Sequence, residues 1–222
     1  MTGSRKWPAT AWRQLLSLAL PALDEVGADV RWTLGGGTAL ALKLNHRISY
    51  DIDIFLEDAG QLHALSPNRN RASRAITDRW QEPGHYVKLV RDEGEIDFLV
   101  AAQLTELDPW ILPFERREIR VEQPAEILAK KLKYRGSRFA VRDIFDLLAI
   151  HAHDPTIVAV AVAAATEATR RAIDRIQRIA PRYRDSIEEE INPTATGAVL
   201  VELDPLEAVE ILRRAASPGP RA

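Results

Sequence analysis

The feature that most constrains this chain is the stretch of residues 34–56, which reads LGGGTALALKLNHRISYDIDIFL. An apolar segment leads into three consecutive glycines. A run of strong helix formers follows, and an alternating acidic segment closes the stretch. Glycine tolerates backbone conformations that other residues avoid, so it marks a tight turn. The order predicts a strand, a glycine turn, a short helix and a second strand.

The glycine turn is a candidate phosphate site. Gly36 and Gly37 precede Thr38, a candidate N-cap at the head of the helical run. A helix N-terminus offers unpaired N–H groups and a partial positive charge, which favour a phosphate. A tight strand-to-helix turn without any ligand is the alternative, because short glycine motifs occur often by chance.

The acidic segment is a candidate metal site. Strand periodicity places Asp51 and Asp53 on one face and their apolar neighbours on the other. Adjacent carboxylates repel each other unless a cation compensates, and oxygen ligands shared with substrate phosphates suit Mg²⁺. The alternatives are two solvated aspartates or an ion pair with Arg47.

A second acidic position lies in a predicted hairpin. Residues 86–90 and 95–100 read as two strands around a turn that ends in Gly94. Asp97 stands between Ile96 and Phe98 in the second strand. Alternation alone leaves open whether this side chain joins the other acids or points into solvent.

Composition limits the broad class of protein. Of the 222 residues, 46% are hydrophobic, the net charge is −2 and no cysteine is present. A buried core is therefore expected, disulfides and thiolate metal sites are excluded, and nucleic-acid binding would need a local basic patch. The longest apolar run, residues 157–165, is far short of the ~20 residues that span a bilayer. With no signal-peptide pattern at the N-terminus, we expect a cytoplasmic protein without a membrane segment.

The second half of the chain reads differently. Pro109 and Pro113 indicate a boundary, beyond which only residues 118–121 keep a strand pattern. Helices are predicted over residues 125–134, 141–151, 156–180 (as one helix or two) and 206–216. We therefore expect an α/β domain over residues 1–105, a mainly helical domain over residues 106–222, and a cleft between them.

Together the two motifs resemble the DNA polymerase β-like nucleotidyltransferases, and within them the AbiEii/AbiGii toxin type. The first matching positions are Gly36, Gly37, Thr38, Ala39, Leu40, His46, Arg47, Ser49, Asp51, Ile52, Asp53, Ile54 and Phe55. A second match within residues 126–148 comprises Ala129, Lys131, Leu132, Arg142, Asp143, Ile144, Asp146 and Leu147. The resemblance implies an α+β fold with a mixed sheet, flanking helices and a helical C-terminal domain.

The resemblance also implies roles for these residues. Asp51, Asp53 and Asp97 would hold Mg²⁺, with Mn²⁺ as an alternative, and Asp97 is the candidate base. Gly36, Gly37 and Thr38 would receive phosphates, assisted by Arg47 and Ser49. Lys131 would steady the leaving pyrophosphate, with Asp143 beside it.

Three points stay open on the sequence alone. The neighbouring Lys130 leaves the choice of lysine unsettled, and Lys131 also reads as an ordinary surface lysine. Arg142 and Asp146, four residues apart, also read as a helix salt bridge.

The family resemblance further implies a function. Such proteins transfer a nucleotide from a nucleoside triphosphate to an acceptor, here expected to be RNA at a tRNA 3′ end, and act as toxins beside a cognate antitoxin. Two alternatives remain: a non-catalytic nucleotide sensor or scaffold on the same fold, and a metal-dependent glycosyltransferase with a DxD motif. The glycine turn upstream of the acids favours nucleotidyl transfer over the glycosyltransferase.

A row of arginines lies outside both motifs. Arg171, Arg175, Arg178 and Arg182 recur every three or four residues and would form a basic stripe on a helix. Such a stripe suits an RNA backbone. A solvated face balanced by Glu167, Asp174 and Asp185 is the alternative.

Overall fold

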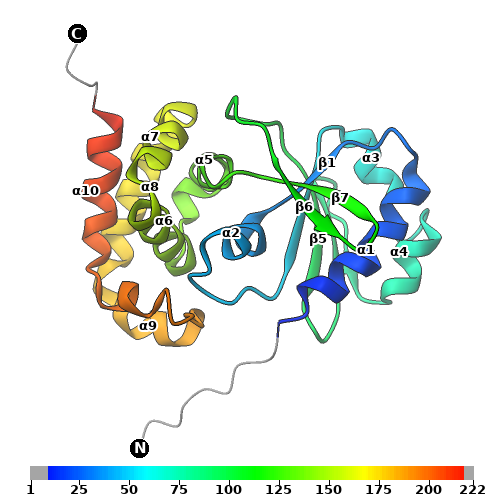
Figure 1. Cartoon of the computed structure of the whole chain (residues 1–222), viewed down its shortest axis with the longest axis horizontal. Helices are drawn as coiled ribbons and strands as arrows, with labels where there is room; N and C mark the ends of the chain where they lie inside the picture. The colour runs from blue at the N-terminus through cyan, green and yellow to red at the C-terminus, as the bar shows by residue number, and fades with distance from the viewer. Residues whose placement is uncertain (1–9, 218–222) are drawn as a thin grey trace, which may run out of the picture.

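The structure, a computed structural model, describes residues 10–217. A seven-stranded sheet and the helices packed on it form one end of the molecule, and a group of C-terminal helices forms the other (Figure 1). The expected α+β fold, with a mixed sheet, flanking helices and a helical C-terminal part, is confirmed.

The sheet is mixed. Its order is β3-β4-β5-β2-β1-β7-β6, with β2 parallel to β5, β1 parallel to β7, and the other neighbours antiparallel. The strands are β1 (Trp32–Gly35), β2 (Ile52–Leu56), β3 (Trp80–Gln81), β4 (Tyr86–Val90), β5 (Glu95–Val100), β6 (Trp110–Phe114) and β7 (Arg117–Val121).

The helices form two groups. Figure 1 shows α1, α3 and α4 at the sheet end and α6 to α10 at the far end, with α2 between them. The α-helices are α1 (Trp12–Val26), α2 (Gly36–Leu44), α3 (Ala59–Ala64), α4 (Arg71–Ile76), α5 (Pro124–Arg135), α6 (Val141–His153), α7 (Pro155–Ala164), α8 (Thr166–Ile179), α9 (Tyr183–Glu190) and α10 (Pro205–Ala216). Three short 3₁₀ turns are η1 (Gly136–Arg138), η2 (Ala180–Arg182) and η3 (Ala198–Glu202).

Most predicted elements are present. The hairpin of β4 and β5 has the predicted bounds, and residues 156–180 form two helices rather than one. Helix α1 contains Pro21 and continues past it to Val26. The buried leucines and alanines along α1 hold it against the core on both sides of this proline.

The sequence predicted that only residues 118–121 keep a strand pattern beyond Pro109, yet Pro113 lies within β6 and Pro109 directly precedes it. Strand β6 is the outermost strand of the sheet, where a missing backbone N–H is tolerated. Strand β7 lies between β6 and β1, so the sheet continues past residue 105. The division into two domains at that residue stays a prediction.

One hydrophobic core joins the two ends of the molecule. Buried apolar side chains from α1 and the sheet belong to the same cluster as those from α5 to α10. In β2 the alternate residues Ile52, Ile54 and Leu56 are fully buried, which leaves Asp53 and Phe55 on the opposite face. Within residues 10–217, no helix is both long and apolar enough to cross a membrane.

Candidate active site

Two of the predicted acids lie side by side in the sheet. The parallel register of β2 and β5 pairs Asp53 with Asp97, and the antiparallel register of β1 and β2 pairs Asp53 with Gly35. Residues directly opposite each other on neighbouring strands point to the same face. The acids from the two motifs therefore meet where β1 ends and the glycine turn begins. Asp97 faces the other acid and not only solvent.

Helix α2 begins three residues earlier than the N-cap prediction requires. It starts at Gly36, with Gly35 as N-cap, so Thr38 lies inside its first turn. The Thr38 side chain is buried, and its hydroxyl donates to the backbone carbonyl of Asp51. The N-cap assignment of Thr38 is thus wrong, and the side chain ties the two motifs together.

Gly36 lies directly beside the Asp53 carboxylate. Its φ of 64° lies in the left-handed region, and a β-carbon placed there would overlap the Asp53 carboxylate. Only a residue without a side chain allows the helix N-terminus and this carboxylate to approach so closely. The positive N-terminal end of α2 and the carboxylate of Asp53 therefore lie in one site.

Gly37 faces the basic side of the same turn. A β-carbon there would lie 2.6 Å from Arg47 Nη2 and 3.2 Å from Ser49 Oγ. The Arg47 guanidinium and the Ser49 hydroxyl therefore lie over the first turn of α2. This places a fixed positive charge and a hydroxyl beside the N-terminal backbone N–H groups of α2, which suits a phosphate.

Asp51 lies just before β2 and is partly engaged. Its Oδ1 accepts a hydrogen bond of 3.0 Å from the backbone N–H of Glu95, at the start of β5. Its charge contributes to raising the pKa of Asp53. All three predicted carboxylates thus lie at the same end of β2 and β5.

Asp51, Asp53 and Asp97, which we call the acid row, bring negative charges close together, and this is unfavourable. Burial raises the pKa of Asp53; Lys131 opposes this shift and Asp51 adds to it. Burial and the charge of Asp53 raise the pKa of Asp97 to about 7, although Lys88 on β4 opposes the change. Lys88 Nζ lies 3.0 Å from Asp97 Oδ2, whereas Asp97 Oδ1 is buried without a hydrogen-bond partner.

These residues fit a divalent cation that a substrate completes. Across residues 10–217, no three His, Cys, Asp or Glu side chains form a ready-made metal site. Mg²⁺ is commonly held by one or two carboxylates together with substrate phosphates and water. Asp53 and Asp97 provide two neighbouring carboxylates, and Asp97 Oδ1 is buried without a hydrogen-bond partner. The N-terminus of α2 lies alongside, so this set of ligands is incomplete until a substrate adds its phosphates.

Lys131 reaches the site from α5. Its Nζ lies 2.6 Å from Asp143 Oδ1 and 3.0 Å from Asp146 Oδ2, and its charge acts on Asp53. Arg135 Nη2, one helical turn further on, lies 3.3 Å from Asp143 Oδ2 and also acts on Asp53. Asp143 therefore orients two cations, Lys131 and Arg135, whose charges act on Asp53.

Asp146 is the fully buried hub of this network. Arg47 donates to both of its oxygens, at 2.7 Å from Nε and 3.0 Å from Nη2, and His46 Nε2 lies 2.7 Å away. Although burial alone would raise it, Arg47, Lys131 and His46 hold the pKa of Asp146 well below its usual range. Arg142 is exposed and forms no ion pair with Asp146 in the described chain, so the alternative of a helix salt bridge is wrong.

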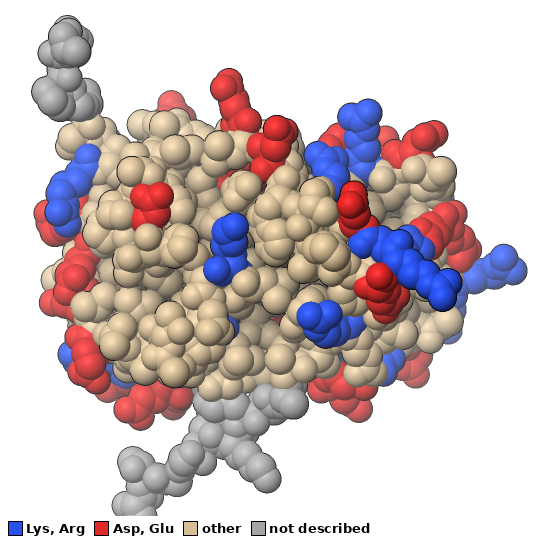
Figure 2. Space-filling view, viewed as in Figure 1, with Lys and Arg blue, Asp and Glu red and all other residues tan. Residues whose placement is uncertain are grey.

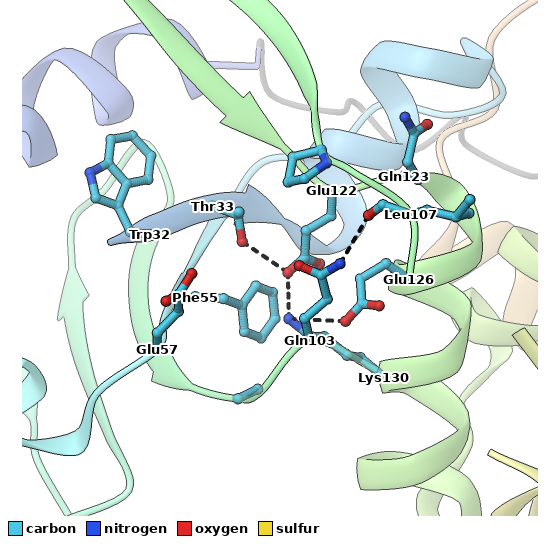
Figure 3. A pocket seen from close by; sticks show the side chains of 12 residues that line it. Trp32, Thr33, Phe55, Glu57, Gln103, Leu107, Glu122, Gln123, Glu126 and Lys130 are labelled. Atoms are coloured by element: carbon cyan, nitrogen blue, oxygen red, sulfur yellow. Dashed lines mark hydrogen bonds and ion pairs between the residues drawn. The ribbon is translucent and has the colours of Figure 1, made fainter. Parts of the chain in front are cut away.

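Lys130 is turned to a different cluster (Figure 3). It pairs with Glu122 and Glu126, and its Nζ lies 4.1 Å from the centre of the Phe55 ring. Glu122 follows β7 and accepts from Thr33 at 3.0 Å; burial raises the pKa of Glu122 to about 7. Sequence reasoning missed Glu122, because only the pairing of β7 with β1 brings it beside the glycine turn.

A C-terminal segment fastens the loop that carries Arg47. The backbone N–H of Ile48 donates to Asn192 O at 2.8 Å, and Arg47 forms an isolated bridge with Pro193. The backbone N–H of Thr194 donates to His46 O at 3.2 Å. Residues 192–197, the C-terminal strap, carry no motif that could have identified them from sequence.

Comparison with known families gives one extensive match. A family model described as "Nucleotidyl transferase AbiEii toxin, Type IV TA system" matches residues 18–214.

Among solved structures, a putative nucleotidyltransferase from H. pylori is 16% identical, with a TM-score of 0.49 over 94% of this chain and 96% of that one. MenT4, a nucleotidyltransferase toxin from Mycobacterium tuberculosis H37Rv, is 17% identical, with a TM-score of 0.47 over 92% and 87%.

A curated relative matches only in part. The aliphatic sulfonates import ATP-binding protein SsuB 1 of Streptomyces avermitilis is 32% identical over 133 residues. The match covers 52% of this chain, and the chain spans about half the length of that protein. The present sequence contains no Gly-Lys pair, and so lacks the G-x-x-x-x-G-K-[ST] loop by which such ATPases hold phosphates.

Proposed function

The chain belongs to the AbiEii family of nucleotidyl transferase toxins of type IV toxin–antitoxin systems, and from this premise we propose that it transfers a nucleotide from a nucleoside triphosphate to an acceptor. The observation that carries the proposal is the register Gly35–Asp53–Asp97 across three neighbouring strands. It joins a helix N-terminus to a pair of carboxylates, the two halves of a metal-and-triphosphate site.

The proposed reaction is an in-line displacement at the α-phosphorus. An acceptor hydroxyl oxygen forms the new bond to phosphorus, the bond from the α-phosphorus to the bridging oxygen breaks, and pyrophosphate leaves with that electron pair. Asp97 is the candidate base for the hydroxyl proton, and its pKa of about 7 in the absence of a bound cation suits a base at neutral pH.

The chain's cations act on the phosphates. The first N–H groups of α2 and the Arg47 guanidinium hold the β- and γ-phosphates, and Ser49 donates beside them. Lys131 balances charge that grows on the departing pyrophosphate. Mg²⁺, held by Asp53 and Asp97 with Asp51 nearby, supplies Lewis-acid stabilisation of attacking and leaving oxygens when bound.

The wider role follows the family. We propose that RNA, at a tRNA 3′ end, is the acceptor, that the transfer makes the protein a toxin, and that a cognate antitoxin binds it. The family description alone supports the toxicity and the antitoxin partner. The acceptor rests on the resemblance of the motifs, with Mn²⁺ as an alternative metal.

The test is incubation of the protein with each labelled nucleoside triphosphate, Mg²⁺ and total RNA. We expect label in RNA with wild type and a loss of at least a hundredfold in Asp53→Ala, since the acid row is broken. Asp29→Ala, which removes an exposed carboxylate before β1, is the matched control and should label RNA as wild type does.

Triphosphate binding by wild type without transfer to any RNA would support the sensor alternative and overturn the proposed reaction. Equal labelling of RNA by wild type and Asp53→Ala would show that the transfer activity does not depend on the acid row.

A further inference from the structure

Five arginines lie at the end of α5, in η1, at the start of α6 and on α8, and we call their side chains the arginine surface: Arg135, Arg138, Arg142, Arg171 and Arg175. Three come from a short stretch at the end of α5 and the start of α6. Two come from the stripe on α8. Segments about thirty residues apart in sequence thus contribute to one surface.

Close packing brings the two groups together. A β-carbon at Gly136 would lie 2.9 Å from Ala168 O and 3.5 Å from Arg171 Cβ, so η1 lies directly on α8. Arg175 Nε donates to Phe139 O at 3.3 Å across the same contact. The arginines therefore share a fixed support and do not belong to separate flexible loops.

Most of this surface lacks a carboxylate partner. Within the described residues, Arg138, Arg142, Arg171 and Arg175 form no ion pair, although Glu167 and Asp174 lie on α8 as well. Arg135 pairs only with the buried Asp143, which Lys131 shares. At Arg171 and Arg175, charge balance therefore does not come from direct ion pairs with the acids of α8.

Several exposed arginines elsewhere on the protein are paired with acids. Ion pairs join Arg79 to Asp92, Arg117 to Asp24, Arg184 to Glu202 and Arg213 to Glu210. On the face shown in Figure 2, basic and acidic side chains intermingle at the end that α1 and α4 occupy. A cluster of arginines without direct ion pairs, on a chain of net charge −2, is a local basic area that favours an external anion.

The arginine surface leads directly to the acid row. Arg135 belongs to both, since it contacts Asp143 and its charge acts on Asp53. A strand whose 3′ hydroxyl reaches the phosphorus above Asp53 must carry its preceding phosphates over neighbouring protein. The arginine surface is a neighbouring area with several unpaired guanidinium groups.

We propose that the arginine surface binds the sugar-phosphate backbone of the acceptor RNA, just upstream of the reacting 3′ end. The proposal rests on the proposed function for the identity of the acceptor. Arginine suits this task because its planar, permanently charged group donates two parallel hydrogen bonds to a phosphate. Clustered guanidinium groups also give the salt-dependent affinity that is typical of backbone binding.

The test compares the double variant Arg138→Ala/Arg171→Ala with wild type. Binding of a fluorescein-labelled RNA hairpin with a single-stranded 3′ end is measured by anisotropy over a range of salt concentrations. We expect affinity about tenfold lower or weaker still at low salt, and a slope of log K against log salt that is shallower by about 1.4, for two lost contacts to a single strand. Binding of a labelled triphosphate with Mg²⁺ should be unchanged.

The matched control is Arg79→Ala/Arg213→Ala, which also removes two exposed arginines, both paired with acids outside the arginine surface. It should bind the hairpin as wild type does. Equal loss in the control, or a wild-type affinity and slope in Arg138→Ala/Arg171→Ala, would overturn the proposal. Wild-type hairpin binding by that variant with reduced binding of a polyglutamate peptide would assign the surface to an acidic protein instead.

Failure of the proposed function is distinguishable. If wild type binds the hairpin through these arginines yet transfers no nucleotide, RNA binding by the arginine surface is supported and the proposed reaction is contradicted. If wild type and the arginine variant label RNA equally well at limiting RNA, the proposed reaction is supported and RNA binding by the arginine surface is contradicted.

Discussion

At the scale of single residues, the site depends on a side chain that is absent. Gly36 combines a left-handed backbone with a position so close to Asp53 that an added β-carbon would overlap the carboxylate. Gly36→Ala should therefore lower nucleotide transfer on the order of a hundredfold, because the added methyl group separates the helix N-terminus from the acid row. Steady-state transfer from a labelled triphosphate measures the effect.

Gly84→Ala separates this clash from simple backbone strain. Gly84 also has a positive φ, 105°, but a β-carbon there would meet nothing within 4 Å. Both variants carry the cost of the strained backbone, whereas only Gly36→Ala meets the carboxylate. Similar losses of activity in the two would show that contact with Asp53 is unimportant.

At the scale of elements, the loop between α2 and β2 is held from the far end of the chain. The C-terminal strap makes backbone hydrogen bonds to this loop on both sides of Arg47, and Thr194 Oγ1 donates to Asn45 O. A β-carbon at Gly197 would overlap the carbonyl of His46. The strap thus sets where the loop, and the guanidinium it carries, can lie.

Gly197→Ala should push this loop away from the strap. We expect kcat/KM for the triphosphate to fall about tenfold to a hundredfold, mainly through KM, because Arg47 moves away from the first turn of α2. Val199→Ala, two residues further on and 72% exposed, is the control and should keep wild-type kinetics. Wild-type KM in Gly197→Ala, with the fold intact by circular dichroism, would contradict the role of the strap.

At the scale of the whole molecule, one buried carboxylate joins the helical part to the α/β part. Asp146 on α6 binds Arg47, which lies 99 positions away in the sequence, and Lys131 on α5. Asp146→Asn should reduce the free energy of unfolding by about 3–5 kcal/mol at pH 7, because it leaves buried cations without their partner. Urea unfolding measures this.

The same group predicts the direction of acid sensitivity. The pKa of Asp146 is depressed in the folded state, so its stabilisation is fully present above the unfolded carboxyl value of about 3.9. It is lost as the pH falls below that value towards the folded pKa. Wild type should lose stability between about pH 5 and pH 2 more steeply than Asp146→Asn.

Asp24→Asn is the control for this measurement, because Asp24 also has a lowered pKa from Arg117 but lies at the surface. Its effect should stay within about 1 kcal/mol. If Asp146→Asn does not fold at pH 7, comparison of wild type with Asp24→Asn across the same pH range carries the test. A flat wild-type profile would then contradict the role of Asp146.

The part of the site that could be predicted from the sequence is the part that depends on neighbouring residues. The glycine run and the alternating acids predicted β1, α2 and β2, because strand and turn preferences depend on neighbouring residues. The hairpin of β4 and β5 followed from the same short-range pattern. The start of α2 was misplaced at Thr38, whose hydroxyl bonds to Asp51 instead of capping the helix.

The sequence by itself determined the chemical inventory: a glycine turn, carboxylates at strand spacing and two adjacent lysines on one helix. Tertiary structure decided which lysine faces Asp53, since Lys130 pairs with Glu122 and Lys131 with Asp143. It also decided that β7 joins β1 and that Arg47 is held by Asp146. Such contacts depend on which distant faces become buried together, and local sequence patterns carry no information about that pairing.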